Sequence, residues 1–367
     1  MKTLLTTLTC LFLTAFSFAK EHRDLTANFQ QGDPQIASIN ALTFGPQGIL
    51  FIGDSKNAKV FAIATEDITE TSLETLELKN VDEVIASSLG TTVDEISIQD
   101  MVVNPISKNA YFAIQTGDGT PVLLKLANGT FENIPLDNTL FSESAINNVL
   151  EEDATDRRGR PLRVWTVSDL SYYNGQVMVS GLSNKEFSST FRSIPFPFEG
   201  KQKESTLEIY HAAHGRYETY APIKAFTAAT VSGKPHLIAS YTCTPLVVFP
   251  LENLKPGEHV KGRTIAELGN WNTPLDMIVM EKDGEQYLLM ANSARAVMKI
   301  KFEDIESFQG GLTTEVEERS GTAGVEFIAL PFVNVLQLDK LNGENFVMLQ
   351  RDASGKLNLT TQTNTWL

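Results

Sequence analysis

The stretch Ile39–Ile63, INALTFGPQGILFIGDSKNAKVFAI, decides the fold of this chain. It contains an apolar strand, a Pro-Gln-Gly turn, a second apolar strand, a small polar loop and a third apolar run. Such a unit cannot bury both of its faces alone. A recurrence of the unit along the chain therefore indicates blades stacked around a shared core.

A degenerate form of this unit recurs along the rest of the chain. Short β-branched and aromatic runs alternate with turns built from Gly, Pro, Asn-Gly or Asp-Gly, which is the chemistry of β-hairpins. The six units start at Asn40, Asp100, Asp169, Thr227, Asp276 and Asn334. We therefore predict an all-β fold, a six-bladed β-propeller with short helical insertions. Seven blades result if Leu73–Val84 or Gly311–Ile328 forms a blade of its own.

Two inserts interrupt this rhythm, at about residues 67–96 and 138–163. Within the first, Val81–Leu89 is predicted to be helical, and within the second we predict a short helix at Ser142–Glu152. Inserts of this size on a propeller are either lids and partner contacts or plain surface loops.

The two ends of the chain suggest how the ring of blades closes. The segment Leu357–Trp366 has the composition of a strand. Pairing it with Leu25–Phe29 would remove two exposed sheet edges, so we predict that this pair closes the ring.

Residues 1–19 have the pattern of a cleavable signal peptide. Lys2 supplies a positive charge, Leu4–Phe18 is apolar, and Ser17-Phe18-Ala19 fits a small-x-small cleavage site. We therefore predict export to a periplasm or the outside of the cell. The remainder, residues 20–367, contains no Pro-, Ser- or Gly-rich linker and is predicted to be one propeller domain.

Cysteine content and charge narrow the classes of partner. Without residues 1–19 only Cys243 remains, so no disulfide can form within the chain. The net charge of −15 opposes binding to nucleic acid or to anionic membranes. No later stretch approaches the roughly 18 uninterrupted apolar residues of a membrane span.

The first unit resembles a known repeat. Ala41–Val60, ALTFGPQGILFIGDSKNAKV, resembles the NHL repeat and the wider six-bladed calcium-dependent propellers, such as the gluconolactonase/regucalcin, paraoxonase and strictosidine-synthase-like families. The resemblance implies a calcium-dependent hydrolase with a metal-binding Glu in the first blade and Asn and Asp in later blades. This chain has Asn40 or Ala41 at the place of that Glu.

The starts of the six units form a candidate metal site. In a propeller the first strand of each blade lines the central channel, and all six starting residues carry a side-chain oxygen. Ca²⁺ takes about six to eight oxygen ligands, and converging carboxylates repel one another unless a cation or a proton relieves them. We predict Asp100, Asp169, Asp276 and Asn334 as ligands of a calcium ion. Alternatively, these side chains cap turn amides.

The loops between second and third strands open on the same face as these starts. They add polar side chains, among which Arg295 can bind a carboxylate or phosphate in bidentate fashion. The Cys243 thiol is either a nucleophile or soft-metal ligand, or an inert buried side chain. The predicted ligand-binding residues of this channel face are Asn40, Asp54, Asn57, Thr227, Cys243, Asn292 and Arg295.

A histidine pair and the tryptophans complete the list of candidates. His211 and His214 are predicted to lie in the hairpin between the third and fourth strands of the third blade, on the opposite face from Cys243. Such a pair can bind Zn²⁺ or Cu²⁺, with Glu218 as a third ligand, or can be structural. The three tryptophans, Trp165, Trp271 and Trp366, are predicted to pack between blades; alternatively, Trp271 reaches the rim of the channel.

Two classes of function are compatible with these features. The first is a module that binds a small molecule or a partner protein through its channel face. The alternative is a metal (calcium)-dependent hydrolase or lactonase-like enzyme with the ion on the central ring. The chain has no G-x-S-x-G elbow, H-E-x-x-H motif or Gly-rich phosphate loop, so its sequence leaves open whether it is an enzyme.

Overall fold

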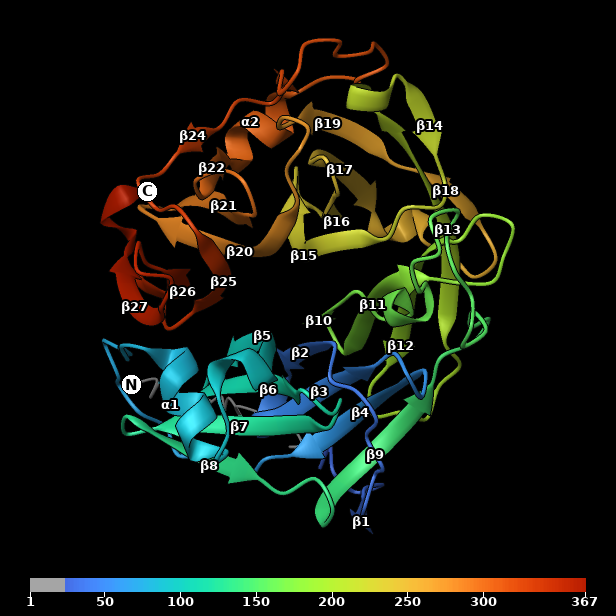
Figure 1. Cartoon of the computed structure of the whole chain (residues 1–367). Coiled ribbons are helices and arrows are strands. Elements are labelled where there is room, and N and C mark those ends of the chain that lie inside the picture. The colour runs from blue at the N-terminus through green and yellow to red at the C-terminus, as the bar shows by residue number, and fades with distance from the viewer. Residues whose placement is uncertain (1–23) are drawn as a thin grey trace, which may run out of the picture.

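The computed structural model describes residues 24–367, so the predicted signal peptide lies outside the described residues. Six separate β-sheets surround a central axis, which confirms the six-bladed propeller (Figure 1). We name each blade by its innermost strand. These strands are β2 (Ala41–Phe44), β5 (Ile96–Val103), β10 (Asp169–Tyr173), β15 (Ile223–Val231), β20 (Pro274–Lys282) and β25 (Val335–Lys340).

The first three blades contain the following outer strands. The β2 blade adds β3 (Ile49–Asp54), β4 (Lys59–Ala64), β9 (Thr139–Ala145) and β1 (Gln30–Gly32). The β5 blade adds β6 (Ala110–Thr116), β7 (Pro121–Ala127) and β8 (Thr130–Ile134). The β10 blade adds β11 (Gln176–Leu182), β12 (Ser189–Pro195), β13 (Lys203–His211) and β14 (Arg216–Glu218), with β18 (His259–Lys261) parallel to β13.

The other three blades carry the helix α2 (Phe302–Ser307) and shorter edge strands. The β15 blade adds β16 (Lys234–Tyr241), β17 (Pro245–Pro250), β19 (Arg263–Glu267) and β23 (Ala323–Gly324). The β20 blade adds β21 (Glu285–Asn292), β22 (Met298–Lys301) and β24 (Ile328–Ala329). The β25 blade adds β26 (Asn345–Arg351) and β27 (Leu357–Thr363). No helix in the described part of the chain has the length and apolar character needed to cross a membrane.

The blades do not follow one another in chain order. Strand β2 contacts both β5 and β10, and β5 contacts β25, so the β5 blade lies between the first and the last blade of the chain (Figure 1). After β8 the chain returns to the β2 blade, where β9 pairs antiparallel with β4. It then continues to the β10 blade on the other side of β2.

This return explains why the predicted helix Ser142–Glu152 is wrong. Residues 142–145 belong to β9, and Val60 and Phe61 on β4 pair with Ser144 and Glu143. The open edge of β4 offers N–H and C=O groups that need partners, and satisfying them outweighs local helix propensity. The other predicted helix is confirmed as α1 (Val81–Ser88).

The prediction that Leu357–Trp366 pairs with Leu25–Phe29 is also wrong. Strand β1 pairs with β9, and β27 meets the connection between β4 and α1 instead. Leu78 and Leu359 exchange two backbone hydrogen bonds of 3.0 and 2.8 Å. Leu73–Val84 therefore completes the β25 blade rather than forming a seventh, and Gly311–Ile328 supplies only β23 and the start of β24 at sheet edges.

Apolar side chains from adjacent blades fill the space between them. Leu42 and Phe61 of the β2 blade pack in one buried cluster with Tyr111 and Ala113 of the β5 blade. Each fully buried large apolar side chain contributes about 1.5–3 kcal/mol to stability. The same alternation of strands that predicts the blades therefore also provides the contacts that hold neighbours together.

Replacing Leu78 by proline should open this closure. The substitution removes the N–H that bonds to the Leu359 carbonyl, and leaving that carbonyl without its partner should cost about 1–3 kcal/mol. We expect a lower Tm and faster proteolysis of the 65–80 connection. Glu70→Pro, at an exposed position of the same connection, is the matched control and should change neither. Equal effects of the two substitutions would show that Leu78 does not close the ring.

Candidate functional site

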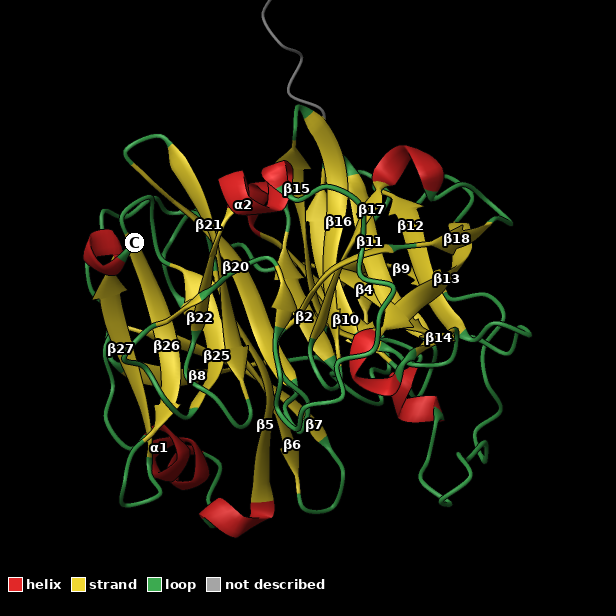
Figure 2. Cartoon of the chain, turned by 90° about the horizontal axis from the view of Figure 1, so that it is seen from above, coloured by secondary structure: helices red, strands yellow, loops and turns green. Residues whose placement is uncertain are grey.

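One face of the propeller collects most of the predicted site residues. We call it the entry face, because the inner strands begin on it and the loops between second and third strands open on it. It is the lower side of the molecule in Figure 2. The β3–β4 loop brings Asn57 to this face, the β16–β17 loop brings Cys243, and the β21–β22 loop brings Arg295.

Three predicted aspartates occupy alternate blades around the channel. Asp100 accepts hydrogen bonds from the N–H of Met101, the next residue, at 2.8 Å and from the N–H of Leu42 in the adjacent blade at 2.6 Å. The other two repeat this arrangement, Asp169 with Leu170 and Phe226, and Asp276 with Met277 and Leu338, at 2.7–2.9 Å. Each carboxylate therefore joins its own inner strand to that of the next blade.

Asn334, the fourth predicted metal ligand, is not part of this ring. It lies exposed just before β25 with a left-handed φ of 56°. Its blade contributes Asp339 instead, which accepts the N–H groups of Val103 at 2.6 Å and Lys340 at 2.7 Å. Sequence reasoning missed Asp339 because it lies near the end of its strand rather than at the start of the repeat.

Gln337 is a second residue that sequence reasoning missed. With its amide nitrogen turned toward the channel, it donates to Asp100 Oδ1 and to Asp276 Oδ2, both at 3.1 Å. Gln337 therefore lies between two carboxylates of the ring and partly offsets their mutual repulsion. The register of β25 shifts just before Gln337, as the registers of β5 and β20 shift just before Asp100 and Asp276, and these shifts are visible only in the strand pairing of the structure.

The ring carboxyls have unusual protonation behaviour. Burial raises the pKa of Asp100 to about 8, and the charges of Asp169 and Asp339 act in the same direction. Burial likewise raises the pKa of Asp339 to about 6, and raises those of Asp169 and Asp276 well above the ordinary range. Their hydrogen bonds to backbone N–H groups lower each pKa but do not outweigh burial.

This arrangement fits a calcium ion poorly. Both oxygens of each ring aspartate already accept backbone N–H groups. Within residues 24–367, the three donor side chains whose ligand atoms all lie within 4.8 Å of one another are found elsewhere, at His211, His214 and Cys243. The donors of the ring thus serve as hydrogen-bond acceptors between blades, and calcium binding stays a prediction.

The predicted polar residues of the first blade stabilise their own loop. Asp54 is buried and accepts hydrogen bonds from the Ala37 N–H, the Ser38 hydroxyl and the Asn57 N–H at 2.6–3.0 Å. Asn40 accepts the Ser38 hydroxyl at 2.8 Å, and Asn57 donates its amide to the Gln35 carbonyl at 2.8 Å. These side chains act as turn caps.

The remaining predicted residues have different surroundings. Thr227 lies within β15 rather than at its start. Asn292 is buried, donates to the Ala296 carbonyl at 3.2 Å and accepts the Asn272 amide at 2.8 Å. The Arg295 guanidinium packs against Gly269, where φ is +99° and a β-carbon would clash with it.

The predicted location of the histidine pair is wrong. His211 ends β13, which is the fourth strand of its blade, because β12 adds a strand that the sequence analysis did not count. One additional strand reverses the face on which a turn emerges. His211 and His214 therefore lie on the entry face, next to Cys243 of the neighbouring blade.

The tryptophans also differ from expectation. Trp271 is exposed, so the prediction that it packs between blades is wrong. Trp165 is half-buried with the Lys224 ammonium 3.1 Å from its ring centre. Burial lowers the pKa of that ammonium to about 8, and the Arg160 charge adds to the effect.

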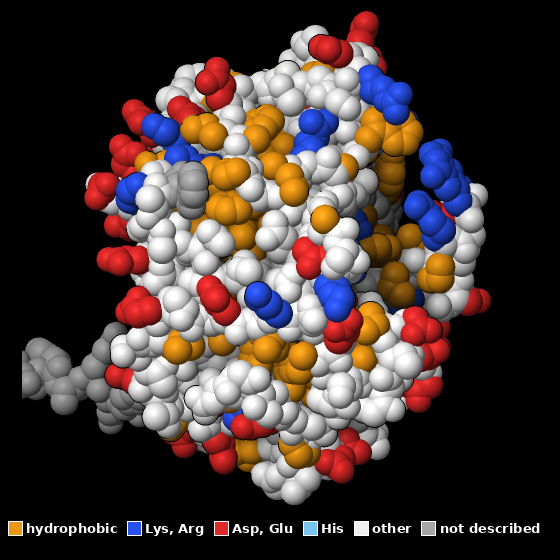
Figure 3. Space-filling model, turned by 60° about the vertical axis from the view of Figure 1, so that its left-hand side comes forward, with side chains coloured by type: hydrophobic (Ala, Val, Ile, Leu, Met, Phe, Trp, Pro, Cys, Tyr) orange, Lys and Arg blue, Asp and Glu red, His pale blue; other side chains and the backbone are white. Residues whose placement is uncertain are grey.

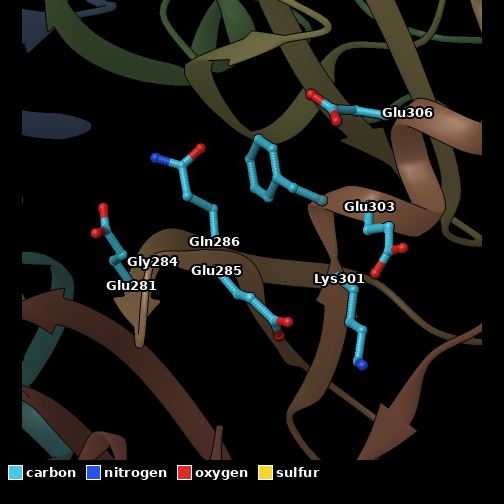
Figure 4. Close-up of a pocket in the computed structure, with 8 residues that line it drawn as sticks. Glu281, Gly284, Glu285, Gln286, Lys301, Glu303 and Glu306 are labelled. Carbon is cyan, nitrogen blue, oxygen red and sulfur yellow. The ribbon is translucent and has the colours of Figure 1, made fainter.

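Two surface hollows lie on the opposite face, which we call the exit face. The larger, about 450 Å³, is lined by glutamates that include Glu281, Glu285, Glu303 and Glu306, together with Lys301 (Figure 4). The other, about 330 Å³, lies beside the β25–β26 hairpin. Neither contains a predicted site residue.

Comparisons with known proteins concern the fold. The chain is similar to the β-propeller domain of Cps50 (Swd1) from Myceliophteria thermophila, with 10% identity over 89% of this chain and 84% of that one at a TM-score of 0.38. It is also similar to the GH43 endo-arabinanase from Bacillus licheniformis, with 17% identity over 72% and 93% at 0.38. A chain of the mitotic checkpoint complex shows 9% identity over 97% and 99% at 0.32.

At the level of sequence, no family model matches the chain, and no curated protein does so either. The resemblance of Ala41–Val60 to NHL repeats and calcium-dependent propellers therefore stays an expectation. The propeller class itself rests on the six sheets.

The ring predicts how stability depends on pH. Since folding raises these carboxyl pKa values, the folded state holds protons that the unfolded chain has lost. Stability from this source is therefore greatest below about pH 4 and falls as pH rises through about 6 and 8. Gln337→Leu removes the donor to Asp100, which is mostly ionised at pH 8.5, so we expect a loss of about 1.5–3 kcal/mol at pH 8.5 and less at pH 5.

Chemical denaturation at the two pH values measures this difference. Gln350→Leu is the matched control. Gln350 lies in the same blade, but its amide donates to the Val333 carbonyl rather than to a ring carboxyl. A loss for Gln337→Leu that is equal at both pH values would contradict the assignment of Gln337 as a donor to the ring.

Proposed function

We propose that this chain is an exported module whose entry face binds a partner protein. The β-propeller is a fold that supports binding of proteins and ligands. The predicted signal peptide at residues 1–19 supports export. One observation carries the choice of face and partner: exposed apolar side chains recur at equivalent places around the entry face.

These side chains lie on the connections that lead into the inner strands. In five of the six blades, an apolar residue two to five positions before the inner strand is between 41% and 73% exposed. They are Val93, Val164, Tyr220, Trp271 and Val333. Single exposed apolar residues are ordinary, but their repetition in the connections before five inner strands places them together on the entry face.

The character of these residues suits a protein interface. Trp and Tyr contribute disproportionately to binding energy in interfaces, and Trp271 is the most exposed of the set. The Arg319 guanidinium lies 5.6 Å from the Trp271 ring centre, which adds the aromatic–Arg chemistry that interfaces favour. Figure 3, in which the entry face is turned to the right, shows hydrophobic side chains in the wall of a hollow with Lys and Arg at its outer rim.

The polar residues argue in the same direction. The side chains of Asp54, Asn57 and Asn292 form hydrogen bonds with the backbone of their own or adjacent loops. They therefore have few donors and acceptors left for a small polar ligand. A macromolecular partner that covers exposed apolar groups is therefore favoured over a small molecule.

The calcium-dependent hydrolase stays the alternative from the sequence. No contact in the ring favours it over the binding module. Metal analysis of the purified mature protein after dialysis tests it, since stoichiometric calcium that disappears in Asp169→Ala would revive the enzyme hypothesis.

Site-specific photocrosslinking tests the binding face. A photoreactive phenylalanine analogue at Trp271 or Val333 should give covalent adducts with one partner in the cells that produce the protein. The same analogue at Ile68, which is 59% exposed and follows β4 on the exit face, is the matched control and should give none. Adducts from position 68 alone, or from no position, would overturn the proposal.

The partner identified by mass spectrometry then allows a quantitative test. If Trp271 contributes about 2 kcal/mol or more to binding of the partner, Trp271→Ser should raise the dissociation constant of the complex by roughly 30-fold or more. Ile68→Ser should leave it unchanged.

A further inference from the structure

Two histidines and a glutamate come together at the end of the β10 blade. Strand β13 ends at His211, a short turn holds residues 212–214, and Gly215 with φ of +61° lets the chain return as β14. The His211 and His214 rings lie 3.9 Å apart, centre to centre. Glu218, at the end of β14, pairs with Ile209 and reaches both rings.

Glu218 orients both imidazoles in the same way. Its Oε2 bonds to His211 Nδ1 at 2.9 Å, and its Oε1 bonds to His214 Nδ1 at 2.7 Å. A carboxylate on one ring nitrogen presents the other nitrogen, Nε2, as a donor to a metal ion.

One of these Nε2 atoms is left without a partner. His211 is only 2% exposed, and among the described residues its Nε2 has no hydrogen bond. Buried polar atoms without a partner are rare in folded proteins, and each calls for a specific explanation. A missing ligand at Nε2 provides one.

A cysteine from the neighbouring blade completes the cluster. Cys243 lies in the β16–β17 turn, where it and Thr244 both have left-handed φ values, 67° and 57°. The Cys243 N–H donates to the Asn272 carbonyl at 2.7 Å, and the Thr244 hydroxyl donates to the Gly269 carbonyl at 2.7 Å. This unusual backbone, held by hydrogen bonds, brings the thiol to the histidines.

The resulting geometry is that of a metal-binding group. One ligand atom each from His211, His214 and Cys243 lies within 4.8 Å of the other two. Bond lengths near 2.0–2.1 Å for nitrogen and 2.3 Å for sulfur allow an ion to reach all three from a point between them.

Two acidic side chains lie beside the cluster. Glu267 is fully buried; its Oε2 accepts the Ala213 N–H at 3.0 Å, and its Oε1 has no partner among the described residues. With Glu218, it places two carboxyl groups beside the histidine turn. Arg216, which is largely exposed, pairs with Glu218 at 3.1 Å, and within residues 24–367 it is the one Lys or Arg that forms an ion pair with either carboxylate.

We propose that His211, His214 and Cys243 bind a transition-metal ion of the zinc or copper class. Imidazole and thiolate select such ions over calcium and magnesium. Three protein ligands leave one position open for water or an exogenous ligand, as in zinc sites that are not purely structural. His214 is partly exposed, so solvent can reach that position. This site is separate from the protein-binding proposal and does not depend on it.

Titration calorimetry of the mature, metal-free protein tests the site. We expect one Zn²⁺ per chain, and bound Co²⁺ should show a thiolate-to-cobalt charge-transfer band that Cys243→Ser abolishes. Cys243→Ser and His214→Ala should each weaken zinc binding by roughly 100-fold or more, since each removes a ligand. Glu218→Gln should weaken it by roughly 10- to 100-fold, as expected for a partner that orients ligands.

His236→Ala is the matched control, because His236 is partly exposed and bonds to the Lys234 carbonyl, outside the cluster. It should leave affinity unchanged, and the Tm of each variant without metal separates loss of a ligand from loss of the fold. Preferential binding of copper that needs the same three residues also supports the site. Absence of zinc, cobalt and copper binding, or binding unchanged in Cys243→Ser, would overturn it and leave the cluster as a structural ion pair.

Discussion

The structure depends on hydrogen bonds that half-buried aspartates make between adjacent blades. Asp100, Asp169 and Asp276 each accept the N–H of their next residue and an N–H from the inner strand of the neighbouring blade. Inner strands crowd around the axis with no sheet partner on that side, so their N–H groups need acceptors. Carboxylates supply them on three alternate blades, and Asp339 supplies one more from the β25 blade; burial of these carboxyls raises their pKa values.

The order of the blades is a second constraint with wide consequences. Because the β5 blade lies between the first and the last blade, the connection between β4 and α1 passes the edge of β27 and closes the ring there. The N-terminal strand β1 therefore takes no part in the closure and pairs with β9 instead. The same detour makes β9 an outer strand of the β2 blade and lengthens that sheet to five strands.

Polar side chains on the entry face differ in whether their donors and acceptors have hydrogen-bond partners. The polar residues of the first loop, Asp54 and Asn57, are fully engaged in turn capping. Two of the buried polar atoms without a hydrogen-bond partner in the described part of the chain, His211 Nε2 and Glu267 Oε1, lie at the junction of the β10 and β15 blades. Their position beside a Cys and a second His makes this junction a better guide to chemistry than the number of polar residues on a face.

The sequence by itself determined the class of fold, the six units, the helix at α1 and the face to which Cys243 and Arg295 belong. These depend on hairpins, whose patterns are local and repeat within a few tens of residues. Only the tertiary structure decided the blade order, the closure at Leu78 and the roles of Asp339 and Gln337, because these follow from pairings between distant segments. It also decided that His211 meets Cys243, since one uncounted strand reverses the face of every later turn in a blade.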